Sequence, residues 1–154
     1  MWKSLLDEPI DDLLAEVLRL ASEGALTIHI GTDSQIRGPG TDFVTAVCVH
    51  TPGKGGRVFT SRLREEKRLT LADKLIQEAE QSLCIARSLE EHTAVPVIVH
   101  LDVNSNPRFG SSKYVKMLAG MVRGNGFEVK LKPDAWCATN VADHVVKRHR
   151  PSAA

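Results

Sequence analysis

The chain has 154 residues, of which 42% are hydrophobic and 25% charged, ordinary values for a globular protein of one domain over residues 1–154. Its formal net charge of +1 lacks the basic surplus of most nucleic-acid binders, so any polyanion site must come from a local basic patch or from bound metal. No apolar run reaches the roughly 20 residues of a membrane span, and the first residues lack a signal peptide's apolar stretch, so we expect no membrane partner and a cytoplasmic protein.

The three cysteines, Cys48, Cys84 and Cys137, lie far apart in the sequence, and no two of them form a Cys-x-x-Cys pair. An odd and scattered set argues against a disulfide framework and against a zinc cage. We therefore expect three reduced thiols, as in proteins of a reducing compartment.

The chain opens with a predicted helix over residues 8–23. Pro9 suits the first helical position, and Gly24 stands where a C-terminal cap belongs. The apolar residues that recur at helical spacing are Ile10, Leu13, Leu14, Val17, Leu18 and Ala21. Residues 26–32 then form a β-rich segment that leads directly into Asp33.

Two further strands are predicted at residues 43–50 and 57–63. Glycine and proline mark a turn at residues 38–40 and a hairpin loop at residues 51–56. Because such short connections join antiparallel neighbours, the first three strands should form a meander.

In the second half of the chain, helical patterns alternate with strands. Thr70 is a plausible N-cap for a long helix that ends near Glu91. Another helix begins at Ser111 or Ser112 and ends at Gly124 or Gly126. The remaining elements are strands at residues 95–101 and 127–131 and a last helix at about residues 139–149.

This order of elements predicts an α/β fold with a mixed five-stranded sheet. Three strands form the antiparallel meander, two strands that alternate with helices join in parallel, and helices flank the sheet. The core then covers residues 26–149, and the helix at residues 8–23 is an addition to it.

Two acids stand at the predicted ends of strands one and four. Asp33 follows the first strand and Asp102 the fourth, and if the two strands are parallel neighbours their ends lie about 5 Å apart. Two carboxylates this close repel each other and need a cation or a shared proton between them. Alone, each aspartate is typical of a turn or a cap, whereas the pair predicts bound Mg²⁺ or Mn²⁺.

Several short motifs, taken in their order, resemble the ribonuclease H-like superfamily. They are the Gly31-Thr32-Asp33-Ser34 end of strand one, the acid that ends strand four and the late Ala142-Asp143 on a helix. The segments Ile30-Gly31-Thr32-Asp33-Ser34-Gln35 and Leu131-Lys132-Pro133-Asp134 look most like its YkuK-type branch, small bacterial proteins described only as RNase H-like. The likeness covers roughly residues 26–148.

The resemblance implies a two-metal site, because nucleases of this superfamily hold two ions with four acids. Carried over, Asp33 and Asp102 are the strand acids and Asp143 is the acid of the last helix, with Asp134 as its substitute. On the long helix Glu78 and Glu80 compete. Glu78 is favoured because it borders the apolar stripe of the helix, whereas Glu80 points further from it.

The function expected from such a site is metal-dependent hydrolysis of phosphodiester bonds in RNA, DNA or a hybrid, with two Mg²⁺ or Mn²⁺ ions. The alternative is a nucleic-acid-binding or protein-binding module that kept the fold and lost turnover, which the small net charge favours. An actin-like phosphotransferase needs two such domains, more than this length holds. The sequence leaves the substrate and the oligomeric state open.

Other candidate residues have simpler interpretations. His29 and His100 share strand faces with the two aspartates but lie deeper, so we expect packed and hydrogen-bonded side chains. His144, beside Asp143, is expected at the surface. Trp136 has the chemistry to stack on a base, although an isolated tryptophan more often packs into the fold.

Overall fold

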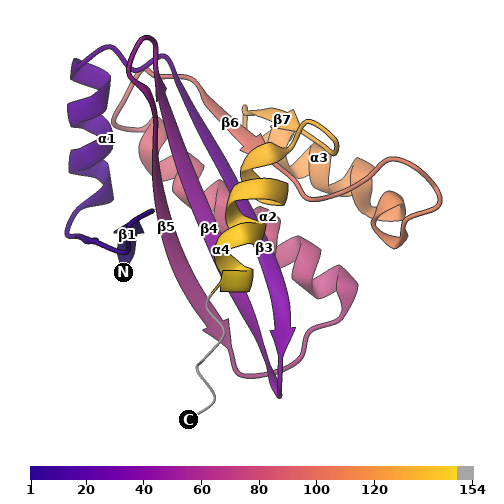
Figure 1. The fold of residues 1–154 in the computed structure, drawn as a ribbon. Coiled ribbons are helices and arrows are strands. Elements are labelled where there is room, and N and C mark those ends of the chain that lie inside the picture. The colour runs from indigo at the N-terminus through magenta and orange to yellow at the C-terminus, as the bar shows by residue number, and fades with distance from the viewer. Residues whose placement is uncertain (149–154) are drawn as a thin grey trace.

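The computed structural model describes residues 1–148, and in this part of the chain a mixed sheet of seven strands has helices on both faces (Figure 1). The strand order is β2-β1-β5-β4-β3-β6-β7. In chain order the elements are β1 (Trp2–Ser4), β2 (Pro9–Ile10), α1 (Leu13–Ser22), β3 (Thr27–Arg37), β4 (Gly40–Thr51), β5 (Gly55–Glu65), α2 (Leu71–Glu90), β6 (Val97–His100), the 3-10 helix η1 (Gly110–Tyr114), α3 (Val115–Gly124), β7 (Glu128–Lys130), the π-helix η2 (Cys137–Ala142) and α4 (Asp143–Arg148).

The mixed α/β architecture is confirmed, but the predicted count of five strands is wrong. The antiparallel meander is β3-β4-β5, and β6 and β7 pair in parallel beyond β3. The two additional strands, β1 and β2, extend the sheet along the outer edge of β5. With three and two residues, they are too short to show an alternating hydrophobic pattern.

The first helix begins later than predicted. The Asp12 side chain accepts a hydrogen bond from the Ala15 amide at 3.1 Å, and this N-cap starts α1 at Leu13. Pro9 instead lies in β2, the outermost strand, where the missing amide hydrogen of proline costs no ladder bond. At the other end, Gly24 has a φ of 101° and terminates the helix as expected.

Other helix boundaries also depend on capping. Thr70 caps α2 by accepting a bond from the Asp73 amide at 3.2 Å, as predicted. In contrast, neither Ser111 nor Ser112 caps the next helix, which starts as the 3-10 turn η1 after Phe109 without a side-chain cap. The last helix begins earlier than expected, with η2, and position 149, where its end and that of the core were predicted, lies outside the described residues.

The two faces of the sheet carry different layers. A large apolar cluster joins the sheet to α1, α2 and α3 on one face, and a smaller one joins it to η2 and α4 on the other. In Figure 1, α4 crosses in front of the central strands and α2 lies behind them. None of the helices in residues 1–148 combines the length and the apolar character that crossing a bilayer requires.

Candidate functional site

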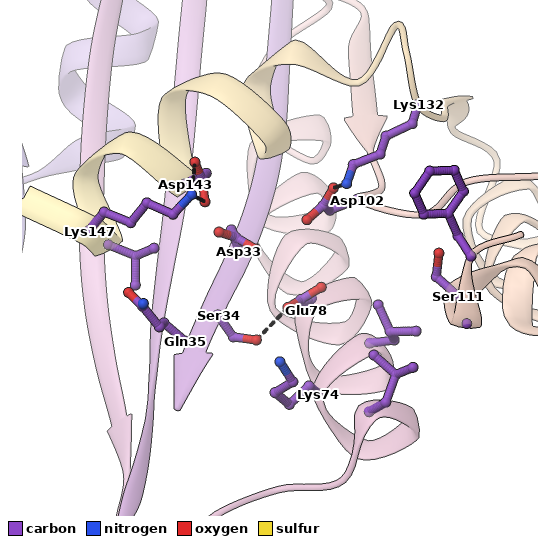
Figure 2. A pocket seen from close by; sticks show the side chains of 15 residues that line it. Asp33, Ser34, Gln35, Lys74, Glu78, Asp102, Ser111, Lys132, Asp143 and Lys147 are labelled. Carbon is purple, nitrogen blue, oxygen red and sulfur yellow. Dashed lines mark hydrogen bonds and ion pairs between the residues drawn. The ribbon is translucent and has the colours of Figure 1, made fainter. Parts of the chain in front are cut away.

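A cleft of about 430 Å³ opens where β3 continues past the end of β6 (Figure 2). It collects side chains from β3, α2, η1 and α4, and from the segments that follow β6 and β7. Its lining residues are Asp33, Ser34, Gln35, Leu71, Lys74, Leu75, Glu78, Asp102, Phe109, Gly110, Ser111, Lys132, Asp143, Val146 and Lys147.

Strand register brings the first two acids to the cleft. The last parallel pair between β3 and β6 is Gly31 with His100, and Asp33 and Asp102 each stand two residues beyond it. The prediction that Asp33 ends its strand is wrong, because β3 stays paired with β4 as far as Arg37. Only β6 ends here, and its end leaves Asp33 open to the cleft on that side.

Two helices supply the other acids. Glu78 is a buried residue of α2, and Asp143 is the first residue of α4. The alternatives do not reach the cleft: Glu80 is exposed on α2, and Asp134 lines a neighbouring hollow. The four favoured acids therefore line one cleft from β3, α2, α4 and the loop after β6, while their roles as ligands stay predictions.

Burial disfavours the charged forms of two of the acids, Asp33 and Glu78. Burial is the main cause that raises the pKa of Asp33 to about 8, and the neighbouring Asp102 and Asp143 contribute to this rise. Burial also raises the pKa of Glu78 well above its ordinary value, although the Ser34 hydroxyl donates a hydrogen bond to its carboxylate. A positive charge in the cleft would relieve both penalties.

Lysines neutralise the other two acids. The Lys132 ammonium lies 2.6 Å from Asp102 Oδ1, and the Lys147 ammonium lies 2.7 Å from Asp143 Oδ1. Asp102 Oδ1 is buried and receives no well-aligned hydrogen bond, so its contact with Lys132 is a charge contact alone. Because both lysines are exposed by more than a third, such ion pairs contribute at most about 1 kcal/mol and exchange readily.

The chemistry of this donor set fits a hard divalent cation. Carboxylate oxygens are the ligands that Mg²⁺ and Mn²⁺ prefer. The raised pKa of Asp33 marks a place where positive charge is short, and the buried Oδ1 of Asp102 lacks an aligned hydrogen-bond donor. Within residues 1–148, however, no three His, Cys, Asp or Glu side chains converge closely enough to form a closed ligand cluster. The acids share a cleft in which lysine ammonium groups stand beside two of them.

Several contacts fix the helix pair that carries Asp143. A Cβ atom on Gly31 would lie 2.4 Å from the Ala138 nitrogen, so η2 packs directly on the backbone of β3. Arg37 and Arg62 donate to the carbonyl oxygens of Val146 and Val145, near the end of α4. The acid on α4 is therefore positioned from the sheet.

A buried histidine pair supports the same helix from behind. The Cys137 amide donates to His100 Nδ1 at 3.2 Å, so His100 Nε2 carries the proton and donates to His29 Nδ1 at 2.9 Å. His29 Nε2 then donates to the Thr27 hydroxyl at 3.2 Å. Both histidines are hydrogen-bonded interior residues, as predicted, and Trp136 packs against both rings.

The remaining predictions concern surface and thiol groups. His144 is exposed and does not line the cleft. All three cysteines carry free thiols, and the fold brings the sulfurs of Cys48 and Cys137 to 3.4 Å although they are distant in sequence.

Sequence reasoning missed the cationic and aromatic members of the cleft, above all Lys132, Lys147 and Phe109. Lys147 had a readable signal, because it follows Asp143 by four residues on one helix. Lys132 follows β7, which pairs in parallel with β6, the strand before Asp102. Lys132 therefore lies at the same carboxyl edge of the sheet as Asp102. Phe109 lies in a loop, for which periodicity gives no signal.

Comparison with known protein families agrees with the fold. The family model described as ribonuclease H-like matches residues 11–147. No curated protein sequence matches the chain. The match does not address the YkuK-type branch, which stays a prediction. Since the matched region spans most of the sequence, the chain belongs to the ribonuclease H-like family.

Proposed function

We propose that the protein is a nuclease that hydrolyses phosphodiester bonds of RNA or DNA with two Mg²⁺ or Mn²⁺ ions, held by Asp33, Glu78, Asp102 and Asp143. One observation carries the proposal: four carboxylates from a strand, two helices and a loop line a single cleft, and two of them are buried with raised pKa values. Membership of the ribonuclease H-like family favours a nucleic acid as the substrate.

Ions held by these four acids would supply the positive charge that activates an attacking water and stabilises the leaving oxygen. The chain's own residues hold and orient the carboxylates. Asp33 is fixed in a strand paired on its far side with β4, and Ser34 orients the Glu78 carboxylate. Lys74, Lys132 and Lys147 line the same cleft and give it positive charge for the phosphate groups of a substrate.

A second candidate is a binding module without turnover. It is favoured by the ammonium groups of Lys132 and Lys147, which already neutralise two of the four acids, and by the lack of a closed ligand cluster in residues 1–148. In such a module the cleft would bind nucleic acid or protein through its lysines alone, and divalent metal would have no effect on binding.

The test is cleavage of a labelled panel of RNA–DNA hybrid, duplex RNA, duplex DNA and single strands, with Mn²⁺, with Mg²⁺ and with chelator. Wild type is compared with Asp102→Asn and with Asp11→Asn, a matched control at an exposed acid outside both the cleft and the neighbouring hollow. A nuclease cleaves at least one substrate with metal, keeps that activity in Asp11→Asn and loses it in Asp102→Asn. No cleavage by folded wild type in saturating metal would favour the binding module. The cytoplasmic location stays a prediction beside this proposal.

A further inference from the structure

Beside the acidic cleft lies a second, more open hollow of about 490 Å³, and Lys132 lines both. The second hollow continues from the cleft along the segment after β7. Its lining residues are Ser105, Val129, Lys130, Leu131, Lys132, Pro133, Asp134 and Trp136. The two hollows together form a path with an ammonium group at their junction and an aromatic ring in each part.

The ring in the first hollow is Phe109, which is 52% exposed although it lines a cleft of charged groups. It belongs to neither apolar cluster of the described fold. Its backbone is nevertheless fixed, because its amide donates to the Asn106 carbonyl and its carbonyl accepts from the Ser112 amide, both at 3.1 Å. The fold therefore holds a large apolar ring at the cleft without using it for packing.

The loop that presents Phe109 is built by its own side chains. Asn104 Oδ1 accepts from the Asn106 amide at 2.9 Å, and Asn106 Oδ1 accepts from the Arg108 amide at 3.0 Å. The Ser111 hydroxyl accepts from the Asn104 amide at 3.1 Å. These turns give the loop a defined shape and so a defined position for the ring.

The ring in the second hollow is Trp136, which is half-buried. Its ring centroid lies 4.7 Å from that of His29 and 4.9 Å from that of His100. The histidine pair fixes the indole from inside the fold, while the remaining part of the ring faces the hollow.

Exposed aromatic rings beside lysine side chains are a recurrent way to bind single strands, because every base offers a flat face for stacking. In a duplex these faces are covered by neighbouring base pairs, and binding depends on many phosphate contacts and a basic surface. A net charge of +1 does not provide such a surface. The path is therefore better suited to unpaired nucleotides than to a double helix.

We propose that the cleft takes a single-stranded segment of nucleic acid, with one base stacked on Phe109, a nearby base on Trp136, and a phosphate group between them in contact with Lys132. The inference rests on the proposed function only in taking nucleic acid as the ligand, and it does not require cleavage. It assigns to Phe109 the discrimination of unpaired from paired nucleotides.

The test measures binding of fluorescein-labelled single-stranded and duplex oligonucleotides of the same sequence by fluorescence anisotropy, in Ca²⁺ to limit hydrolysis. The variants are Phe109→Ala, Phe109→Tyr and the control Met117→Ala, an exposed side chain on α3 outside both hollows. Loss of one stacked base should weaken single-strand binding about 5- to 150-fold in Phe109→Ala. Phe109→Tyr and Met117→Ala should bind as wild type does.

A second readout follows Trp136 itself in a Trp2→Phe background, where it is the remaining tryptophan. A single strand should quench its fluorescence, and the matched duplex should not. Equal affinity for single strand and duplex, an unchanged Kd in Phe109→Ala, or no binding to any oligonucleotide would each overturn the inference. Cleavage confined to duplexes would overturn the single-strand inference and support the proposed nuclease. Single-strand binding through Phe109 without any cleavage would support the inference and overturn the proposed nuclease.

Discussion

Asp102 offers a way to separate metal binding from folding. In the substitution Asp102→Asn the side chain keeps its shape but loses its charge. The partner lost in the fold is the partly exposed Lys132, whose ion pair contributes at most about 1 kcal/mol. For a domain of this size, that is at most about 4 °C in melting temperature. Asp33 also loses a repelling neighbour, which partly offsets the change.

The melting temperature should respond far more strongly to bound metal. At a Mn²⁺ concentration a hundred times the Kd, binding to the native state contributes about 2.7 kcal/mol. This corresponds to a rise of roughly 5–11 °C in the melting temperature of wild type. If Asp33 and Asp102 share an ion, Asp102→Asn should lose most of that rise while its metal-free melting temperature stays close to that of wild type.

The assay is thermal unfolding followed by circular dichroism, with and without Mn²⁺, on wild type, Asp102→Asn and the exposed control Asp134→Asn. Only Asp102→Asn should lose the response. A full Mn²⁺-induced rise in Asp102→Asn would refute the reasoning, because it would place the ion away from the end of β6. An equal loss in both variants would refute it as well, because Asp134 lines only the neighbouring hollow.

Three further predictions follow from the same contacts. Lys132→Met should enlarge the Mn²⁺-induced rise in melting temperature, because it removes the ammonium that competes for Asp102, and an unchanged rise relative to the exposed control Lys116→Met would contradict this. Gly31→Ala should lower the free energy of unfolding by about 1–3 kcal/mol in chemical denaturation, because its Cβ would meet the backbone of η2, whereas Gly120→Ala has open space and should be neutral or stabilising. Burial lowers the pKa of His29, and it lowers the pKa of His100 to about 3. The unfolded chain, in which the histidine pKa is about 6.5, therefore binds protons first, and the stability that the neutral pair contributes is lost as the pH falls from about 6.5 toward about 3. The free-energy difference between wild type and His29→Gln should therefore shrink over that range, and a constant difference would contradict the assignment.

The sequence could predict the site as far as local patterns reach. Paired acids after two apolar strands predicted that Asp33 and Asp102 would lie near each other, and the shared register of β3 and β6 brings both to one cleft. Glu78 was favoured from its place beside the apolar stripe of its helix, and it is buried at the cleft. The first inference used the expected order of the strands, and the second used the periodicity of a single helix.

What could not be predicted depends on contacts between elements. The later start of α1 follows from the Asp12 cap, which competed with an equally plausible Pro9 start. The early start of the last helix as η2 depends on packing against Gly31, a contact that no pattern within residues 137–148 encodes. Lys132 carries an ordinary surface charge in the sequence, and only its tertiary proximity to Asp102 gives it a role, whereas Lys147 follows Asp143 by four residues on one helix.

The self-closed loop after Asp102 has a consequence for engineering. From Asn104 onward its hydrogen bonds run among its own residues and to η1, whereas Val103 is buried in the apolar core and accepts a hydrogen bond from the Lys132 amide. Residues 104–109 can therefore be shortened, lengthened or exchanged as a module without moving Asp33 or the η2–α4 pair, which are held from the sheet. Grafting a different loop at this point would alter which ligand is admitted while leaving the underlying chemistry in place.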